Sequence, residues 1–289
     1  MPVLGQPRVT TGNGYQIIND DCVRVLSEME PGSVDLVFCD PPYNIGYDAY
    51  DAHDDNMPPG DYLDWCHRWL YECVCILKFT GCLWVAMGDE YVSEVDTLVK
   101  NLVSEDNRQW SKRSHVVWYY TFGVNCPKNF SRSHTRLLYY AHTDSKRRTF
   151  NFADSRLRIP SARQLIYNDK RATIGGKLPD NTWVISPVDL ARAFTVDEDT
   201  WLESRVCGTF KERKSRGEYG VVKGVPQMPV ELMARIIRAT SNTGDLVVDP
   251  FVGTGSTGVA AIKLARKFIG IDKSKTCCKM SVERIVKGE

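Results

Sequence analysis

The sequence has almost no net charge: 37 Lys and Arg stand against 36 Asp and Glu, which leaves +1. This balance neither requires nor excludes nucleic acid as a partner, because phosphate binding depends on a local basic face. Basic residues do gather at 146–148 and at 211–216. Either run is also normal for a solvated surface, so charge alone leaves the partner open.

The sequence also lacks several segments that would define its class. No apolar run approaches the length of a membrane span, and the N-terminal residues lack the pattern of a secretory signal peptide. The ten cysteines show no repeated Cys-x-x-Cys spacing of a zinc site. Cysteines scattered through apolar stretches are typical of small buried side chains. We therefore expect reduced thiols, no metal and a cytoplasmic protein, or a nuclear one if eukaryotic.

Apolar patterning predicts strands and helices that alternate along the 289 residues. Such alternation favours an α/β fold, a three-layer sandwich around a mostly parallel, Rossmann-like sheet. The predicted strands cover residues 15–19, 34–39, 82–87, 246–248 and 268–271, with β-prone aromatic runs at 116–121 and 137–142. The predicted helices cover residues 22–29, 62–78, 90–102, 230–240 and 256–264.

The alternation decays between residues 122 and 224, where charged, glycine and aromatic residues mix without a clear period. We expect an inserted region there, between two parts of one α/β domain at 1–121 and 225–289. One half of the sheet is then expected from residues 15–121 and the other from residues 229–289.

Residues 249–255 (DPFVGTG) join a predicted strand to a predicted helix. Glycine at such a corner lets the backbone approach a ligand closely, and the first amides of the helix face electron-rich groups. Downstream, Asp272 closes the next strand, where a carboxylate can accept hydrogen bonds from both hydroxyls of a ribose. The segment therefore predicts a site for a nucleoside-containing cofactor.

Two other interpretations of the glycines remain open. Gly253, Gly255 and Gly258 match the dinucleotide fingerprint G-x-G-x-x-G, which would indicate an NAD-dependent oxidoreductase. The carboxylate and rigid turn of residues 249–251 before the glycines count against it, as does the short sequence after Asp272. The glycines could also form a purely structural turn.

A second corner, residues 40–43 (DPPY), follows a buried strand. No strand continues through two prolines, so this is a loop at the carboxyl edge of the sheet, where α/β proteins bind ligands. The corner suits chemistry on the amino group of a nucleobase, whose lone pair is delocalised into the ring. Acceptors aimed at its N–H groups favour the pyramidal geometry that frees this lone pair. Asp40 and the Pro41 carbonyl can supply two fixed acceptors.

Tyr43 adds an aromatic face on which a base can stack, worth roughly 1–3 kcal/mol. A base in duplex DNA must be rotated out of the helix to reach such a corner. The alternative is a structural Pro-Pro turn whose Asp40 caps a loop.

Together, DPPY and DPFxGxG resemble the signatures of the amino-methyltransferase family of restriction–modification systems, which modifies adenine N6 or cytosine N4. The order, with the catalytic motif first, resembles the β group, a circular permutation of the common methyltransferase fold. The resemblance implies S-adenosylmethionine as cofactor and double-stranded DNA as substrate. It also implies a catalytic half at 1–121, a target-recognition region at 122–224 and a cofactor-binding half at 225–289.

The resemblance assigns roles to matching residues. The catalytic ones are Asp40, Pro41, Pro42 and Tyr43. The cofactor-binding ones are Asp21, Cys22, Gln227, Asp249, Pro250, Phe251, Gly253, Thr254, Gly255, Ser256 and Asp272. The segment around Gln227 departs from the family, because its usual histidine is missing. Candidate DNA contacts are Lys128, Arg132, His134 and Arg136, with Asn125, Asn129, Lys146 and Arg163 as further candidates.

Asp before the two prolines resembles the adenine enzymes, whereas Ser is typical of cytosine N4 enzymes. We therefore expect methylation of adenine N6 by direct in-line attack, without a covalent intermediate. Cytosine N4 is the main alternative; RNA as substrate and a catalytically silent DNA-binding subunit are others. Relatives suggest a possible homodimer and a cognate restriction endonuclease.

Overall fold

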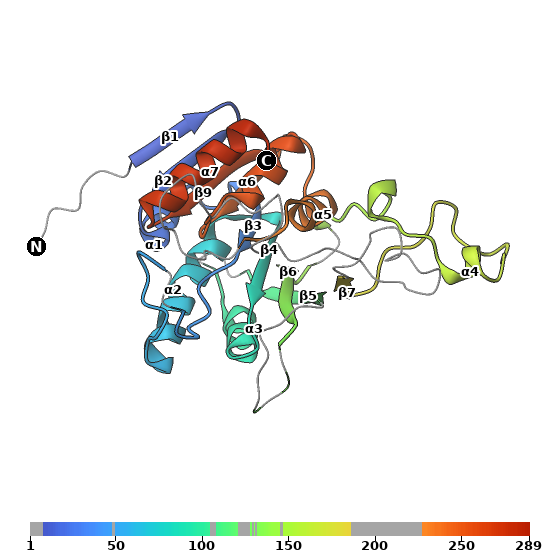
Figure 1. The fold of residues 1–289 in the computed structure, drawn as a ribbon, viewed down its shortest axis with the longest axis horizontal. Helices are drawn as coiled ribbons and strands as arrows, with labels where there is room; N and C mark the ends of the chain where they lie inside the picture. The colour runs from blue at the N-terminus through green and yellow to red at the C-terminus, as the bar shows by residue number, and fades with distance from the viewer. Residues whose placement is uncertain are drawn as a thin grey trace, which may run out of the picture.

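The computed structural model describes residues 8–47, 50–104, 108–120, 128, 130, 132–144, 147–185 and 227–289. Nine strands in these ranges form a single sheet (Figure 1). The strands are β1 (Arg8–Gly12), β2 (Tyr15–Asn19), β3 (Val34–Cys39), β4 (Leu77–Met87), β5 (Trp110–Tyr120), β6 (His134–His142), β7 (Thr182–Ile185), β8 (Leu246–Asp249) and β9 (Lys267–Asp272).

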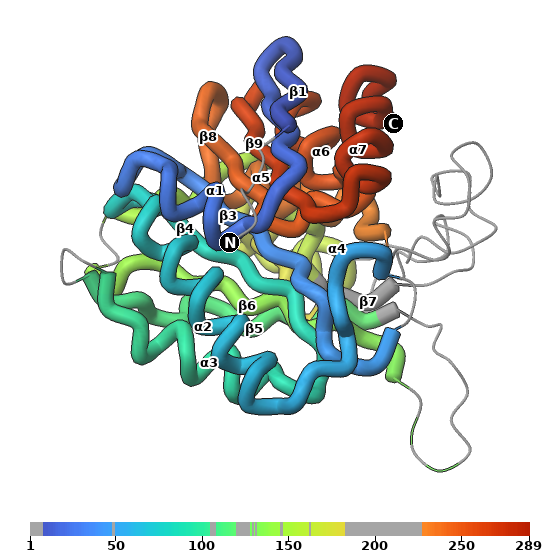
Figure 2. The backbone as a smooth tube through the Cα atoms, turned by 90° about the vertical axis from the view of Figure 1, so that its left-hand side faces the viewer, coloured from blue at the N-terminus to red at the C-terminus, as the bar shows by residue number. Residues whose placement is uncertain are grey.

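The order across the sheet is β1-β2-β9-β8-β3-β4-β6-β5-β7. The pairs β2–β9, β9–β8, β8–β3, β3–β4 and β5–β7 are parallel, and the others are antiparallel. Figure 2 shows the C-terminal part of the chain (orange to red) lying against β1 and β2 (blue), because β9 adds to β2.

Helices cover both faces of the sheet. They are α1 (Cys22–Ser27), α2 (Pro59–Ile76), α3 (Val92–Asn101), α4 (Ala162–Leu165), α5 (Val230–Thr240), α6 (Ser256–Lys263) and α7 (Lys275–Lys287), with a short 3-10 turn at Ser155–Leu157. In β3, Leu36 and Phe38 pack with α5, α6 and α7, whereas Val37 and Cys39 pack with α1, α2 and α3. The strand period of two thus builds a core on each face, and the predicted three-layer α/β sandwich is confirmed.

Three features differ from the sequence prediction. The sheet is not limited to residues 15–121 and 229–289, because β6 and β7 come from the expected insertion and β6 lies between β4 and β5. The short edge strand β1 and the last helix, α7, were not predicted. Strand β4 begins earlier than expected because α2 ends at Ile76 and the chain enters the sheet at once.

The cysteines in the described part of the chain are free thiols and mostly buried, which agrees with the expected reduced state. Within the same ranges, no helix combines the length and the hydropathy that crossing a membrane requires. The candidates Asn125, Asn129 and Lys146 lie outside the described residues, as do residues 186–226 of the expected insertion.

Candidate active site

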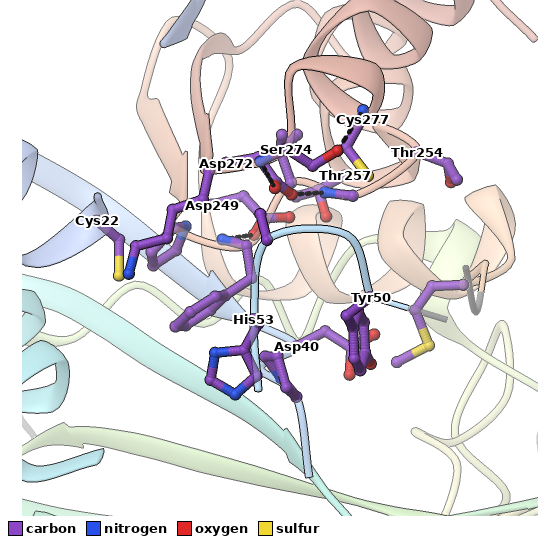
Figure 3. Close-up of a pocket in the computed structure, with 18 of the residues that line it drawn as sticks. Cys22, Asp40, Tyr50, His53, Asp249, Thr254, Thr257, Asp272, Ser274 and Cys277 are labelled. Carbon is purple, nitrogen blue, oxygen red and sulfur yellow. Dashed lines mark hydrogen bonds between the residues drawn. The ribbon is translucent and has the colours of Figure 1, made fainter. Parts of the chain in front are cut away.

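The two corners singled out in the sequence meet at one edge of the sheet. Strands β3 and β8 are parallel neighbours, with Val37 opposite Val248, so their carboxyl ends lie side by side. The loops that follow, which begin at Asp40 and at Asp249, line the same pocket (Figure 3). The empty space in and in front of this pocket is about 1000 Å³, a volume that includes open solvent.

The Pro-Pro corner is held by two tyrosines. The buried Tyr62 of α2 donates a hydrogen bond to the Pro42 carbonyl at 2.8 Å. The hydroxyl of Tyr43 donates to Asp40 Oδ1 at 2.7 Å. Burial raises the pKa of Asp40 to about 6, and the Tyr43 hydrogen bond opposes this rise. The Asp40 carboxyl therefore changes its protonation close to neutral pH.

The glycine corner is built around Asp272 at the end of β9. Its Oδ2 accepts the Gly253 N–H at 2.9 Å, and its Oδ1 accepts the Ser274 N–H at 2.8 Å. Burial raises the pKa of Asp272 to about 6 and that of the buried Asp249 to about 7. The corner thus places two carboxylates beside backbone amides.

Gly255 has a structural role at this corner. Its φ is 87°, and a Cβ there would lie 2.6 Å from the Cβ of Ser281 on α7. A side chain would therefore be strained twice, by the backbone conformation and by the close approach of the helix. Gly255 itself does not line the pocket, so its contribution is to let the corner lie against α7.

A buried arginine on α7 supports the two hydroxyls of the glycine corner. Arg284 Nη1 donates to Thr254 Oγ1 and to Ser256 Oγ, each at 3.0 Å, and to the Thr254 carbonyl at 2.9 Å. Both hydroxyl residues also line the pocket. No sequence signal identified Arg284, because α7 itself was not predicted.

Aromatic side chains form one wall of the pocket. The ring of Phe251 lies 5.7 Å from that of Trp65, and the ring of His53 lies 4.8 Å from that of Trp65. Burial lowers the pKa of His53, which favours its neutral form. An apolar wall of this kind suits a flat heterocycle.

Residues 50–53 cross from the Pro-Pro corner to the glycine corner. Tyr50, Asp51 and His53 line the pocket, and Asp51 Oδ2 accepts a hydrogen bond from Ser274 Oγ at 2.8 Å. Figure 3 shows Tyr50 and His53 on the same side as Asp40. These residues were missed because a non-periodic loop gives no signal of where it folds.

The structure brings most of the predicted site residues together, with five exceptions. The pocket is lined by Cys22, Asp40, Pro42, Asp249, Pro250, Phe251, Gly253, Thr254, Ser256 and Asp272. The predicted residues outside the lining are Asp21, Pro41, Tyr43, Gln227 and Gly255. Asp21 instead caps α1 through the Val23 amide at 2.9 Å and pairs with Lys273 at 2.7 Å.

The candidate DNA-contacting residues lie at the same edge of the sheet but pair with acids. Arg136, opposite Met87 at the end of β4, bonds Asp89 at 3.1 Å, and His134 bonds Asp89 at 3.0 Å. Arg132 forms an ion pair with Glu90. Lys128 and Arg163 are both exposed, and Arg163 lies in the short helix α4. DNA would therefore compete with the Asp89 carboxylate for this surface.

Comparison with known proteins gives one consistent result. A family model described as DNA methylase matches residues 34–283. The type II methyltransferase M.HpaI of Haemophilus parainfluenzae is 32% identical over 270 residues, which cover 93% of this chain and 74% of that protein. The DNA adenine methyltransferase YhdJ of Escherichia coli K12 is 30% identical over 277 residues, which cover 93% of this chain and 82% of that one.

Solved structures share the fold. The cytosine-N4-specific PvuII DNA methyltransferase superimposes with a TM-score of 0.64 at 16% identity, covering 96% of this chain and 95% of that one. The M1.HpyAVI–SAM complex superimposes with a TM-score of 0.57 at 18% identity, covering 94% and 98%. With its sheet, its two converging corners and these matches, the chain belongs to the family of N6/N4 DNA methylases.

Proposed function

We propose that this DNA methylase transfers the methyl group of S-adenosylmethionine to the N6 amino group of adenine in a specific DNA sequence. The observation that carries the proposal is the shared pocket: Asp40 from one corner and Asp272 from the other open into the same space. A donor at the glycine corner would face an amine held at the Pro-Pro corner. Holding two reactants in this way supplies much of the acceleration in such reactions.

The pocket has the features that this cofactor requires. When bound, S-adenosylmethionine supplies an electrophilic methyl group on a positively charged sulfur. Asp272 can accept from ribose hydroxyls, and the wall of Phe251 and Trp65 can pack against adenine. Asp249 adds a carboxylate that favours a cation. The structurally similar M1.HpyAVI has been solved with SAM, which supports the proposal.

The Pro-Pro corner would hold the target amine. The Pro42 carbonyl already accepts from Tyr62. Our proposal therefore assigns the Pro41 carbonyl and the Asp40 carboxylate as the two acceptors for the amine. Asp40 Oδ1 accepts from Tyr43, which leaves Oδ2 for the incoming amine and the Tyr43 ring for stacking on the base.

Adenine is preferred over cytosine on two grounds. Asp40 stands before the prolines, as in adenine enzymes, and the DNA adenine methyltransferase YhdJ is 30% identical. The similarity to the cytosine-N4-specific PvuII enzyme, at 16% identity, concerns the fold alone. Residues 122–224 are proposed to recognise the target sequence. A homodimer and a partner endonuclease remain predictions, which light scattering and genome context would test.

The experiment is methyl transfer from labelled S-adenosylmethionine to DNA and RNA oligonucleotides, followed by digestion and mass spectrometry of the nucleosides. We expect N6-methyladenine in DNA and none in RNA. Detection of N4-methylcytosine instead would show that the target is cytosine, the alternative to adenine. A wild-type protein that binds the cofactor but modifies neither polymer would be a silent DNA-binding subunit.

A further inference from the structure

A buried carboxylate outside the pocket holds the loop that follows the Pro-Pro corner. Asp55 is 4% exposed and does not line the pocket. Its Oδ1 accepts the Asn44 N–H at 2.7 Å, and its Oδ2 accepts the Tyr47 N–H at 2.9 Å and the Ile45 N–H at 3.1 Å. Its own carbonyl accepts the Gly46 N–H at 2.7 Å. One residue therefore satisfies four consecutive amides.

The backbone of this loop explains why an anion is needed there. Residues 44–47 belong to no strand or helix, so regular structure gives their amides no partners. Asn44 and Gly46 have φ values of 57° and 73°, whereas most residues have negative φ. Successive amides in mixed conformations can point to one side and form a concave anion site. Here the anion is Asp55 of the chain itself.

A second set of bonds ties the same loop to the same segment. The side chain of Asn44 accepts from the Met57 N–H at 2.7 Å and donates to the Met57 carbonyl at 2.9 Å. The segment 55–57 thus binds both the backbone and a side chain of the residues directly after Tyr43. These hydrogen bonds would restrain Tyr43 and, through the Tyr43 hydroxyl, Asp40.

We propose that Asp55 is a positioning residue, which fixes Tyr43 and Asp40 for methyl transfer by holding the backbone of residues 44–47. This inference rests on the proposed function. Asp55 does not line the pocket, so its effect would pass through the loop. Its loss should therefore lower turnover much more than donor binding, because misplacement of reacting groups by about 1 Å can cost roughly 100-fold.

The test compares Asp55→Ala and Asp55→Asn with the matched control Asp54→Asn. Asp54 is exposed and accepts only the Asn56 amide, at 3.0 Å, among the bonds described. We expect kcat of Asp55→Ala to fall about 100-fold, with a smaller loss in Asp55→Asn, which keeps one acceptor. The Kd of S-adenosylmethionine should stay within about threefold in all variants. Hydrogen exchange should accelerate at the amides of residues 44–47.

Three results would overturn the inference: protected amides at 44–47 in Asp55→Ala, a kcat equal to that of Asp54→Asn, or donor affinity that falls in step with kcat. If Asp55→Ala does not fold, Asp55→Asn is judged by the same criteria. A wild-type protein that methylates no DNA would refute the proposed function instead. In that case the exchange measurement still decides whether Asp55 holds the loop.

Discussion

The hydrogen bond between Tyr43 and Asp40 leads to a pH-dependent prediction for Tyr43→Phe. The ionised Asp40 carboxylate is a stronger acceptor for the N–H of the target amine than the protonated acid, which turns one of its oxygens into a donor. Burial raises its pKa to about 6, and the Tyr43 hydroxyl, 2.7 Å from Oδ1, opposes this rise. Phenylalanine keeps the aromatic face and removes only this donor. The pKa of Asp40 should therefore rise further, so that more of the carboxyl is protonated at a given pH.

The size of the effect follows from the strength of the lost bond. A hydrogen bond to a charged group contributes about 1.5–3 kcal/mol, and 1.36 kcal/mol corresponds to about one pH unit. Allowing for partial replacement by water, the acid limb of kcat/KM should move up by about one pH unit. If activity follows the fraction of ionised Asp40, the variant should be about fivefold below the wild type at pH 6 and nearly equal at pH 8.

The assay measures kcat/KM for DNA from pH 5.5 to 8.5 with saturating donor, because this ratio reports groups of the enzyme before DNA binds. Asp40→Asn is the control, since it removes the titrating carboxyl and should remove the acid limb assigned to it. Tyr43→Ala should be lower at every pH, because it also removes the stacking face. An unchanged profile in Tyr43→Phe would refute the link between Tyr43 and Asp40. A loss of equal size at every pH would mean that the hydroxyl acts in the reaction itself.

Three further substitutions test the other parts of the site. Asp40→Ala should abolish methyl transfer while calorimetry finds near wild-type donor binding; retained transfer would remove Asp40 from its role. Asp272→Asn should weaken donor binding about 10- to 100-fold, through the loss of charged acceptors, and an unchanged Kd would exclude a contact with the ribose. Gly255→Ala should lower the free energy of unfolding by roughly 2–4 kcal/mol in urea titrations, from its positive φ and its contact with α7. Gly244→Ala, with φ 86° and open space around it, should lose less, and equal losses would contradict the packing argument.

The fold could be predicted from sequence where strands are buried on both faces. Residues 34–39 and 246–248 are short apolar runs that end in acid and proline, and both proved to be central strands. The edges of the sheet gave weaker signals. Strand β1 is exposed along most of its length, so no apolar pattern marks it. Residues 137–142 of strand β6 were recognised as β-prone. In the sheet, however, β6 pairs directly with β4, although β5 lies between them in the sequence, and local patterns do not predict such a pairing.

The site was predictable to the extent that single corners carry it. A Pro-Pro turn and a glycine turn can be recognised from a few neighbouring residues, because proline restricts the backbone and glycine permits conformations that other residues avoid. The residues that complete the pocket do so from a distance. Trp65 had a place in a predicted helix, but nothing in the helical period shows that it meets Phe251. In the sequence, Asp55 is one acid among several in a polar stretch, and its burial depends on how that loop folds.

The near-zero net charge conceals a separation of charge within the fold. Acidic side chains gather in the pocket, where Asp40, Asp249 and Asp272 have pKa values raised by burial to between about 6 and 7. A cation bound at the glycine corner would favour the ionised forms of Asp249 and Asp272, so donor binding and deprotonation of these two carboxyls should reinforce each other. At the same edge of the sheet, Arg132 and Arg136 carry positive charge and form ion pairs with acids of the loop after β4. A protein that binds a cation in its pocket and a polyanion beside it needs both signs of charge at one edge, and a net charge of only +1 is compatible with such an arrangement.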